Sequence, residues 1–120
     1  MQEEEKAIYS FRSGFNCSQS VLTAYSDYLN LDENTAKNIT SGFGSGMGRL
    51  QETCGAVTAS FMVISLFNGL KYSDNNESKE AAISMIQEFT KKFKSNNGVI
   101  DCTSLIKSEI IGQKKFVINR

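Results

Sequence analysis

The chain has 120 residues, of which 40% are hydrophobic, and its 13 basic residues balance 13 acidic ones to give a formal net charge of zero. This length suits one domain that can bury a core, so we expect residues 1–120 to form a single domain. The balanced charge lacks the broad basic excess of nucleic-acid-binding proteins, and we expect no nucleic-acid partner.

The sequence contains no histidine and no proline. The lack of histidine excludes catalytic triads that use imidazole, the common zinc sites with histidine ligands, and haem ligation by histidine. The lack of proline favours uninterrupted helices. The chain starts with the acidic segment MQEEEKAIYSF, which lacks the apolar region of a secretory signal. We therefore expect a cytoplasmic protein, in which three cysteines stay reduced unless their function is to be oxidised.

The first predicted helix spans residues 3–13, and Gly14 can supply the left-handed residue that ends it. The second begins at Asn16, which forms a capping-box pattern with Gln19 three residues later. The apolar face of this second helix consists of Val21, Leu22, Tyr25 and Leu29.

A third helix is predicted from Glu33 to about Ser41, with Asp32 as its N-cap. It leads into a loop with glycine at every second position, namely Gly42, Gly44, Gly46 and Gly48.

The following segment, about residues 52–68, has apolar residues on every side of a helical wheel, which indicates a helix surrounded by protein or lipid. The run is shorter than the roughly 20 apolar residues of a membrane span and contains Thr58, Ser60 and Ser65, so we expect no membrane insertion. It predicts the central buried helix of an all-α protein, a small bundle of about five to six helices.

Two further helices are predicted in the second half of the chain. The polar segment after Gly69 offers Asp74 and Asn76 as N-caps for a long amphipathic helix that ends near Gly98. Asp101 is the predicted N-cap of a shorter helix that runs to about Gly112. The tail that follows has no clear structural signal.

The three cysteines, Cys17, Cys54 and Cys102, each fall in the first turn of a predicted helix. Free N–H groups and the positive end of the helix dipole stabilise a thiolate there, which makes the sulfur a better nucleophile or metal ligand. Their spacing is too wide for a CxxC hairpin or a zinc knuckle, so they can act together only if the bundle brings these helix starts to one place. The alternative is that they pack as small apolar side chains.

The glycine loop is a second candidate site. Gly46, Gly48 and Arg49 precede a helix N-terminus and could bind an anion or another ligand. The phosphate-binding fingerprints GxGxxG and GK[ST] do not fit this loop. A tight turn that allows close helix approach is therefore the favoured interpretation of the glycines.

Three runs of sequence carry a resemblance to a known family. They are NCSQSVL at residues 16–22, GSGMGRLQETCGAVTAS at residues 44–60, and DCTSLI at residues 101–106. Together they resemble the "Putative redox-active protein" family that is named for its C_GCAxxG_C_C signature. The resemblance covers about residues 5–112. It implies a small, mainly helical protein in which characteristic cysteines perform thiol redox chemistry.

By this resemblance, Cys17, Cys54 and Cys102 match the first three of the four family cysteines. The chain departs from the signature at two places, because Ala59 stands where the motif Cys-Gly-Ala-x-x-Gly ends in glycine, and because there is no fourth cysteine.

Two function classes remain open. The first is a thiol-based protein with an oxidoreductase-like activity, in which Cys54 is the central thiolate and Cys17 and Cys102 are its partners. These thiols would exchange disulfides with a redox partner protein, or hold a metal ion or an iron–sulfur centre. The second is a non-catalytic helical module for binding or oligomerisation, such as a homodimer, with structural cysteines. The distances between the cysteines discriminate between the two classes.

Overall fold

The computed structural model describes residues 2–102, and this part of the chain contains five α-helices and no strand. The helices are α1 (Glu3–Arg12), α2 (Cys17–Ala24), α3 (Glu33–Thr40), α4 (Gly55–Lys71) and α5 (Asn75–Asn97). The predicted all-α class is therefore confirmed. Beyond Cys102, the helix predicted from Asp101 to about Gly112 and the tail that follows it lie outside the described residues.

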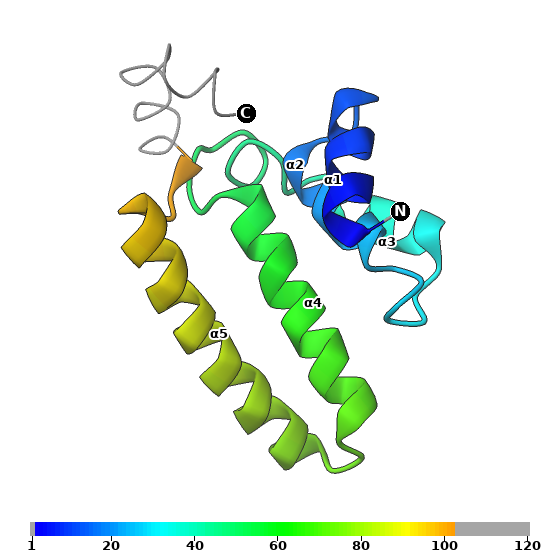
Figure 1. Ribbon diagram of the computed structural model, residues 1–120, viewed down its shortest axis with the longest axis vertical. Coiled ribbons are helices and arrows are strands. Elements are labelled where there is room, and N and C mark those ends of the chain that lie inside the picture. Colours follow the sequence, from blue (N-terminus) through cyan, green and yellow to red (C-terminus); the bar gives the residue numbers. More distant parts are fainter. Residues whose placement is uncertain (1, 103–120) are drawn as a thin grey trace.

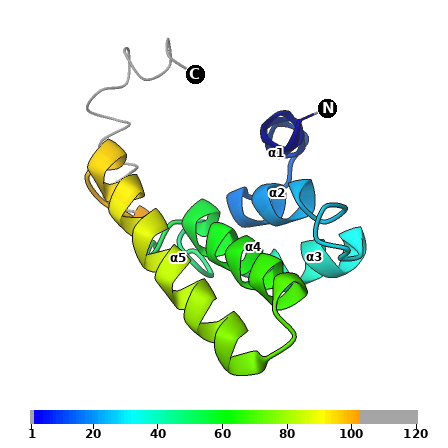
Figure 2. The ribbon, with the colours of Figure 1, turned by 60° about the horizontal axis from the view of Figure 1, so that its bottom comes forward.

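Helix α4 lies in the middle of the molecule, with α5 beside it on one side and α1 to α3 on the other (Figures 1 and 2). Helix α2 packs on α4, α1 and α3, and α5 packs on α4. The centre of the core consists of Leu22, Ala36 and Ala59, which come from α2, α3 and α4 and are almost fully buried. The partly buried side chains around this centre are Val21, Leu31, Met62, Val63 and Leu66.

The predicted N-caps explain where the helices begin. The Asn16 side chain accepts a hydrogen bond from the Gln19 amide at 2.8 Å, and the Gln19 side chain accepts one from the Asn16 amide at 3.1 Å, so the capping box is complete. The Asp32 side chain caps α3 and the Asp74 side chain caps α5, each by accepting a hydrogen bond from the amide three residues later. Asn76, the other predicted cap, lies inside α5 instead.

Helix α2 is shorter than the apolar pattern predicts, because it ends at Ala24 rather than continuing to Leu29. The Tyr25 and Ser26 amides bond to carbonyls three residues earlier, and the Ser26 hydroxyl donates to the Thr23 carbonyl at 2.8 Å. Such local hydroxyl bonds compete with the regular helix. Leu29 is still buried, so the apolar pattern identified a core residue but not the end of the helix.

Helix α4 takes the predicted central position, although it begins at Gly55 rather than near residue 52. Its burial is less complete than a fully apolar wheel predicts. The buried residues of α4 are Gly55, Val57, Ala59 and Asn68, whereas most of its large apolar side chains are half-buried and Leu70 is exposed. Neighbouring helices cover two sides of α4, and Phe61 meets Phe89 of α5 edge to face.

Among the helices of residues 2–102, none is both long and apolar enough to cross a membrane.

Candidate functional site

The glycine loop adopts an unusual backbone conformation. Five consecutive residues, 45–49, have positive φ angles between 50° and 73°. Gly46 and Gly48 adopt this conformation easily, whereas each other residue in the left-handed region costs about 1–2 kcal/mol. Hydrogen bonds within the loop offset this cost, for example from the Gly48 amide to the Gly42 carbonyl and from the Glu52 amide to the Gly46 carbonyl.

The glycines allow the loop to touch two other segments. A Cβ atom on Gly44 would lie 2.8 Å from the Asn16 side chain at the start of α2, and one on Gly46 would lie 2.7 Å from the Cys102 Cβ. Both distances are too short for real side chains. The prediction of a tight turn with close helix approach is therefore confirmed, and the loop links the start of α2 to Cys102.

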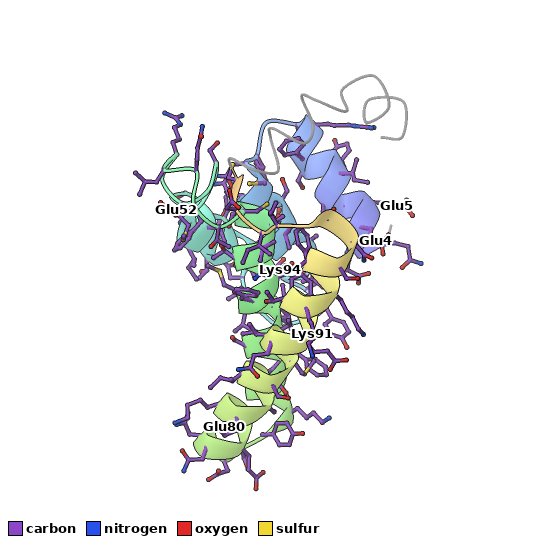
Figure 3. All side chains as sticks on the ribbon, turned by 90° about the vertical axis from the view of Figure 1, so that its left-hand side faces the viewer. Glu4, Glu5, Glu52, Glu80, Lys91 and Lys94 are labelled. Atoms are coloured by element: carbon purple, nitrogen blue, oxygen red, sulfur yellow. The ribbon has the colours of Figure 1, made fainter. Side chains whose placement is uncertain are left out.

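A short backbone pairing brings Cys54 and Cys102 together. Thr53 and Asp101 form an isolated antiparallel bridge. On either side of it, the Cys54 amide donates to the Ile100 carbonyl at 2.7 Å and the Cys102 amide donates to the Glu52 carbonyl. Cys54 and Cys102 each follow a bridged residue directly, so the pairing holds the backbones of these two cysteines close together. Figure 3 places Glu52, and with it this pairing, at the end of the α4–α5 pair opposite Glu80.

Cys17 reaches the same place from α2. It is the first residue of α2, and its Sγ would lie 2.6 Å from a Cβ atom on Gly55, the first residue of α4. The sulfur therefore rests against the backbone directly after Cys54. The N-termini of α2 and α4 therefore meet at this sulfur.

Cys54 is the N-cap of α4, whereas the sequence predicted it in the first turn of the helix. Its side chain makes no capping hydrogen bond with the described residues. Next to it, the buried hydroxyl of Ser18 has no hydrogen-bond partner within residues 2–102, and the Ser18 Cβ would lie 3.2 Å from a Cβ atom on Gly55. The start of α4 is thus packed tightly against the first two residues of α2.

Electrostatic coupling connects the three sulfurs. Burial raises the pKa of the Cys102 thiol above its ordinary value, and the neighbouring charges of Cys54, Cys17 and Asp101 raise it further. All three cysteines are free thiols, of which Cys102 is buried and the other two are half-buried. The structure thus brings the three predicted cysteines to one end of the bundle, where the surroundings of Cys102 favour its protonated form.

Within residues 2–102, no group of three or more cysteine, aspartate and glutamate side chains is arranged to hold a metal ion. Binding of a metal ion or an iron–sulfur centre by the three cysteines stays a prediction.

The three residues of the predicted ligand loop, Gly46, Gly48 and Arg49, do not all face the same hollow. Gly48 and Arg49 line a hollow of about 350 Å³, whereas Gly46 packs against Cys102. The Gly48 and Arg49 amides donate to the carbonyls of Gly42 and Gly44, so these two amides are already used inside the loop. Of the three predicted residues, Arg49 alone offers a charged side chain to an anion.

Sequence reasoning missed the contribution of α1 to this region. A hollow of about 470 Å³ lies between α1 and α2, and Cys17 forms part of its wall together with Phe11 and Arg12. The helical spacing of Ile8 and Phe11 is visible in the sequence, but it does not show what their side chains contact. Both side chains are about half exposed, at 53% and 52%.

Comparison with known proteins places the chain in a family. A family model described as "Putative redox-active protein (C_GCAxxG_C_C)" matches residues 15–119. No curated protein and no solved structure matches the chain significantly. Because the family model spans most of the sequence and includes all three cysteines, the chain belongs to this C_GCAxxG_C_C family, described as "Putative redox-active protein".

Proposed function

We propose that the protein exchanges disulfides with a thiol substrate or partner, with Cys17 as the attacking thiolate and Cys54 as the resolving thiol. The observation that carries this proposal is the position of the Cys17 sulfur against Gly55, where the N-termini of α2 and α4 meet and Cys54 is the adjacent residue. Membership of a redox-active family supports the same chemistry.

The reaction transfers two electrons from the protein to the substrate. The thiolate of Cys17 attacks one sulfur of a disulfide, forms a mixed disulfide and releases the other substrate sulfur as a thiolate. Cys54 then attacks the sulfur of Cys17, which forms the Cys17–Cys54 disulfide and releases the second substrate thiolate. The two released thiolates take up the two protons that the protein thiols lose. A reducing partner protein with a dithiol would reverse the sequence.

Cys102 has a different role in this proposal. Burial and the neighbouring negative charges raise the pKa of Cys102 above that of an ordinary thiol, so its protonated form is favoured. A protonated thiol is a poor nucleophile, because the thiolate is the reactive form. Cys102 therefore does not start the exchange, and its neutral side chain keeps a further negative charge away from the reacting sulfurs.

Single substitutions test this division of roles. The reduced protein is mixed with a small disulfide, and covalent adducts are located by mass spectrometry of peptides. We expect Cys54→Ser to accumulate the mixed disulfide on Cys17, whereas Cys17→Ser forms little adduct. Cys102→Ser is the matched control and should still form the Cys17–Cys54 disulfide. If Cys17→Ser reacts at the rate of the unmodified protein, the proposed attacking residue is wrong.

A homodimeric helical module is the second candidate function. It is supported by apolar side chains on the surface of α4 and α5, where Leu70, Ile83 and Met85 are 61%, 42% and 40% exposed. Light scattering of the reduced protein tests it. A dimer that dissociates in Ile83→Asp, together with thiols that form no disulfide, would favour the module. A monomer would rule out this second candidate.

A further inference from the structure

The hollow beside Cys17 has the size and chemistry of a small-molecule site. Its volume of about 470 Å³ falls within the range of roughly 300–1,000 Å³ that is typical of ligand pockets. Ile8 and Phe11 of α1 and Val21 of α2 provide apolar walls, and Ala56 closes it on the side of α4. We call this hollow, defined by these residues with Arg12 and Cys17, the α1–α2 pocket.

Helix α1 contributes to this pocket rather than to the core. None of its residues is buried, and α2 is the helix on which it packs. Ile8 and Phe11 remain about half exposed although they face the pocket. Covering large apolar side chains removes them from water and is favourable. A ligand with an apolar body would therefore gain free energy by filling the space between α1 and α2.

The charged side chain at this pocket is a cation. Arg12 belongs to the lining of the pocket. Within residues 2–102 the ion pair is that between Lys92 and Glu88, so Arg12 has no acidic partner in this part of the chain. An arginine guanidinium binds a carboxylate through paired hydrogen bonds. The pocket thus combines an apolar wall, a cation without an ionic partner among the described residues, and a thiol next to two helix N-termini.

We propose that the α1–α2 pocket binds the substrate of the thiol chemistry, and that this substrate is a small organic disulfide with an apolar body and a carboxylate. This inference rests on the proposed function. The apolar body lies between Ile8, Phe11 and Val21, the carboxylate pairs with Arg12, and the disulfide meets the sulfur of Cys17. The thiolate of Cys17 then displaces one half of the substrate as a thiolate, as described above.

Three small disulfides of different charge test the pocket. They are 5,5′-dithiobis(2-nitrobenzoate), which is aromatic and anionic, 4,4′-dithiodipyridine, which is aromatic and uncharged, and cystamine, which is aliphatic and cationic. The rate of reaction is measured for each reagent with the reduced full chain, and mass spectrometry identifies modification at Cys17. Because the leaving thiols of these reagents differ in pKa, each rate is divided by the rate of the same reagent with free cysteine in solution. We expect this ratio to be larger for the anionic aromatic reagent than for the cationic one.

Substitutions in the pocket have specific expected effects. Arg12→Gln should slow the anionic reagent about three- to fivefold, the effect of losing one partly exposed charge pair, and leave the uncharged reagent unchanged. Arg12→Glu should reverse the preference between the anionic and cationic reagents. Phe11→Ala should slow both aromatic reagents about fivefold because an apolar contact is lost. The matched controls are Lys79→Gln on α5 and Tyr9→Ala on α1, neither of which lines the pocket.

The outcomes separate this inference from the proposed function. Circular dichroism first verifies that each variant is folded, which we expect because α1 has no buried residue. If the Arg12 and Phe11 variants react like the two controls while the Cys17–Cys54 disulfide still forms, the pocket assignment is wrong and the exchange chemistry stands. If the pocket variants change the rates as expected but no protein disulfide forms, the site binds such molecules and the proposed exchange fails.

Discussion

Replacing Gly46 by alanine should disrupt the contact between the glycine loop and Cys102. Gly46 has a φ angle of +73°, and an added Cβ would lie 2.5 Å from the Gln51 Cα, 2.6 Å from the Glu52 amide nitrogen and 2.7 Å from the Cys102 Cβ. The left-handed conformation costs about 1–2 kcal/mol for alanine, and forcing extra atoms into a packed site costs about 1–3 kcal/mol more. We therefore expect Gly46→Ala to lower the free energy of unfolding by about 2–5 kcal/mol.

Gly48→Ala is the matched control for this substitution. Gly48 also has a positive φ angle, +62°, but the nearest atom to an added Cβ is the Gly42 carbonyl oxygen at 3.8 Å, an ordinary contact. This variant should lose about 1–2 kcal/mol, from the backbone conformation alone. Urea unfolding followed by circular dichroism measures both variants. Equal losses for the two would refute the inference that Gly46 packs against the Cys54–Cys102 pairing.

Three further predictions concern the surroundings of the cysteines. Gly55→Ala should displace the Cys17 sulfur, since the added Cβ would lie 2.6 Å from that sulfur, and should therefore slow formation of the Cys17–Cys54 disulfide. Gly69→Ala in the same helix is the control, because its added Cβ meets nothing within 4 Å. This control should raise the unfolding free energy by about 0.5–1 kcal/mol. Disulfide formation measured by thiol titration compares the two, and equal rates would contradict the proposed packing of Cys17. The pKa of Cys102 is raised in the folded state, so the folded protein keeps a proton that the unfolded chain releases. The free energy of unfolding should therefore be unaffected below about pH 8.5 and should fall as the pH rises from there through the folded pKa. Unfolding curves in this range should depend less on pH in Cys102→Ser, and an unchanged pH dependence would argue against a buried thiol. Asn16→Ala should lower the unfolding free energy by about 0.5–2 kcal/mol, because the Asn16 side chain caps α2 and also donates to the Ser41 carbonyl. Asp32→Ala, which removes an exposed cap, is the comparison in thermal melts. A smaller loss of stability in Asn16→Ala than in Asp32→Ala would show that the bond to Ser41 contributes nothing.

Local sequence signals predicted most of the helical architecture. The caps Asn16, Asp32 and Asp74 are determined by side chains that bond to amides three residues away, so the sequence alone contains the whole interaction. The apolar run after Cys54 likewise predicted the central position of α4. These features depend on residues that are neighbours along the chain.

The arrangement of the candidate site depends on contacts between distant residues, which spacing does not reveal. The pairing of residues 52–54 with residues 100–102 involves a single bridge, too short to produce an alternating strand pattern. The left-handed conformation of Ser45, Met47 and Arg49 opposes the intrinsic preference of these residues and is held by bonds within the folded loop. The sequence therefore predicted which cysteines to consider, but only the fold shows that their backbones meet.

The apolar residues of α1 illustrate a further limit of sequence patterns. Helical periodicity identifies the face that avoids water, but it does not say whether another helix or a ligand covers that face. Ile8 and Phe11 lie at helical spacing in the sequence, and the structure places them at the wall of the α1–α2 pocket. Their significance depends on the position of Cys17 in the same hollow.

A redox titration of the cysteines tests the central claim most directly. The protein is equilibrated in glutathione buffers of increasing oxidising strength, the remaining thiols are blocked, and peptide mass spectrometry identifies each disulfide. We predict that a disulfide between Cys17 and Cys54 forms and is reduced reversibly, with one midpoint, while Cys102 stays reduced. If the three cysteines remain reduced throughout, or if each forms only a mixed disulfide with glutathione, their proximity does not serve disulfide exchange and the account is contradicted.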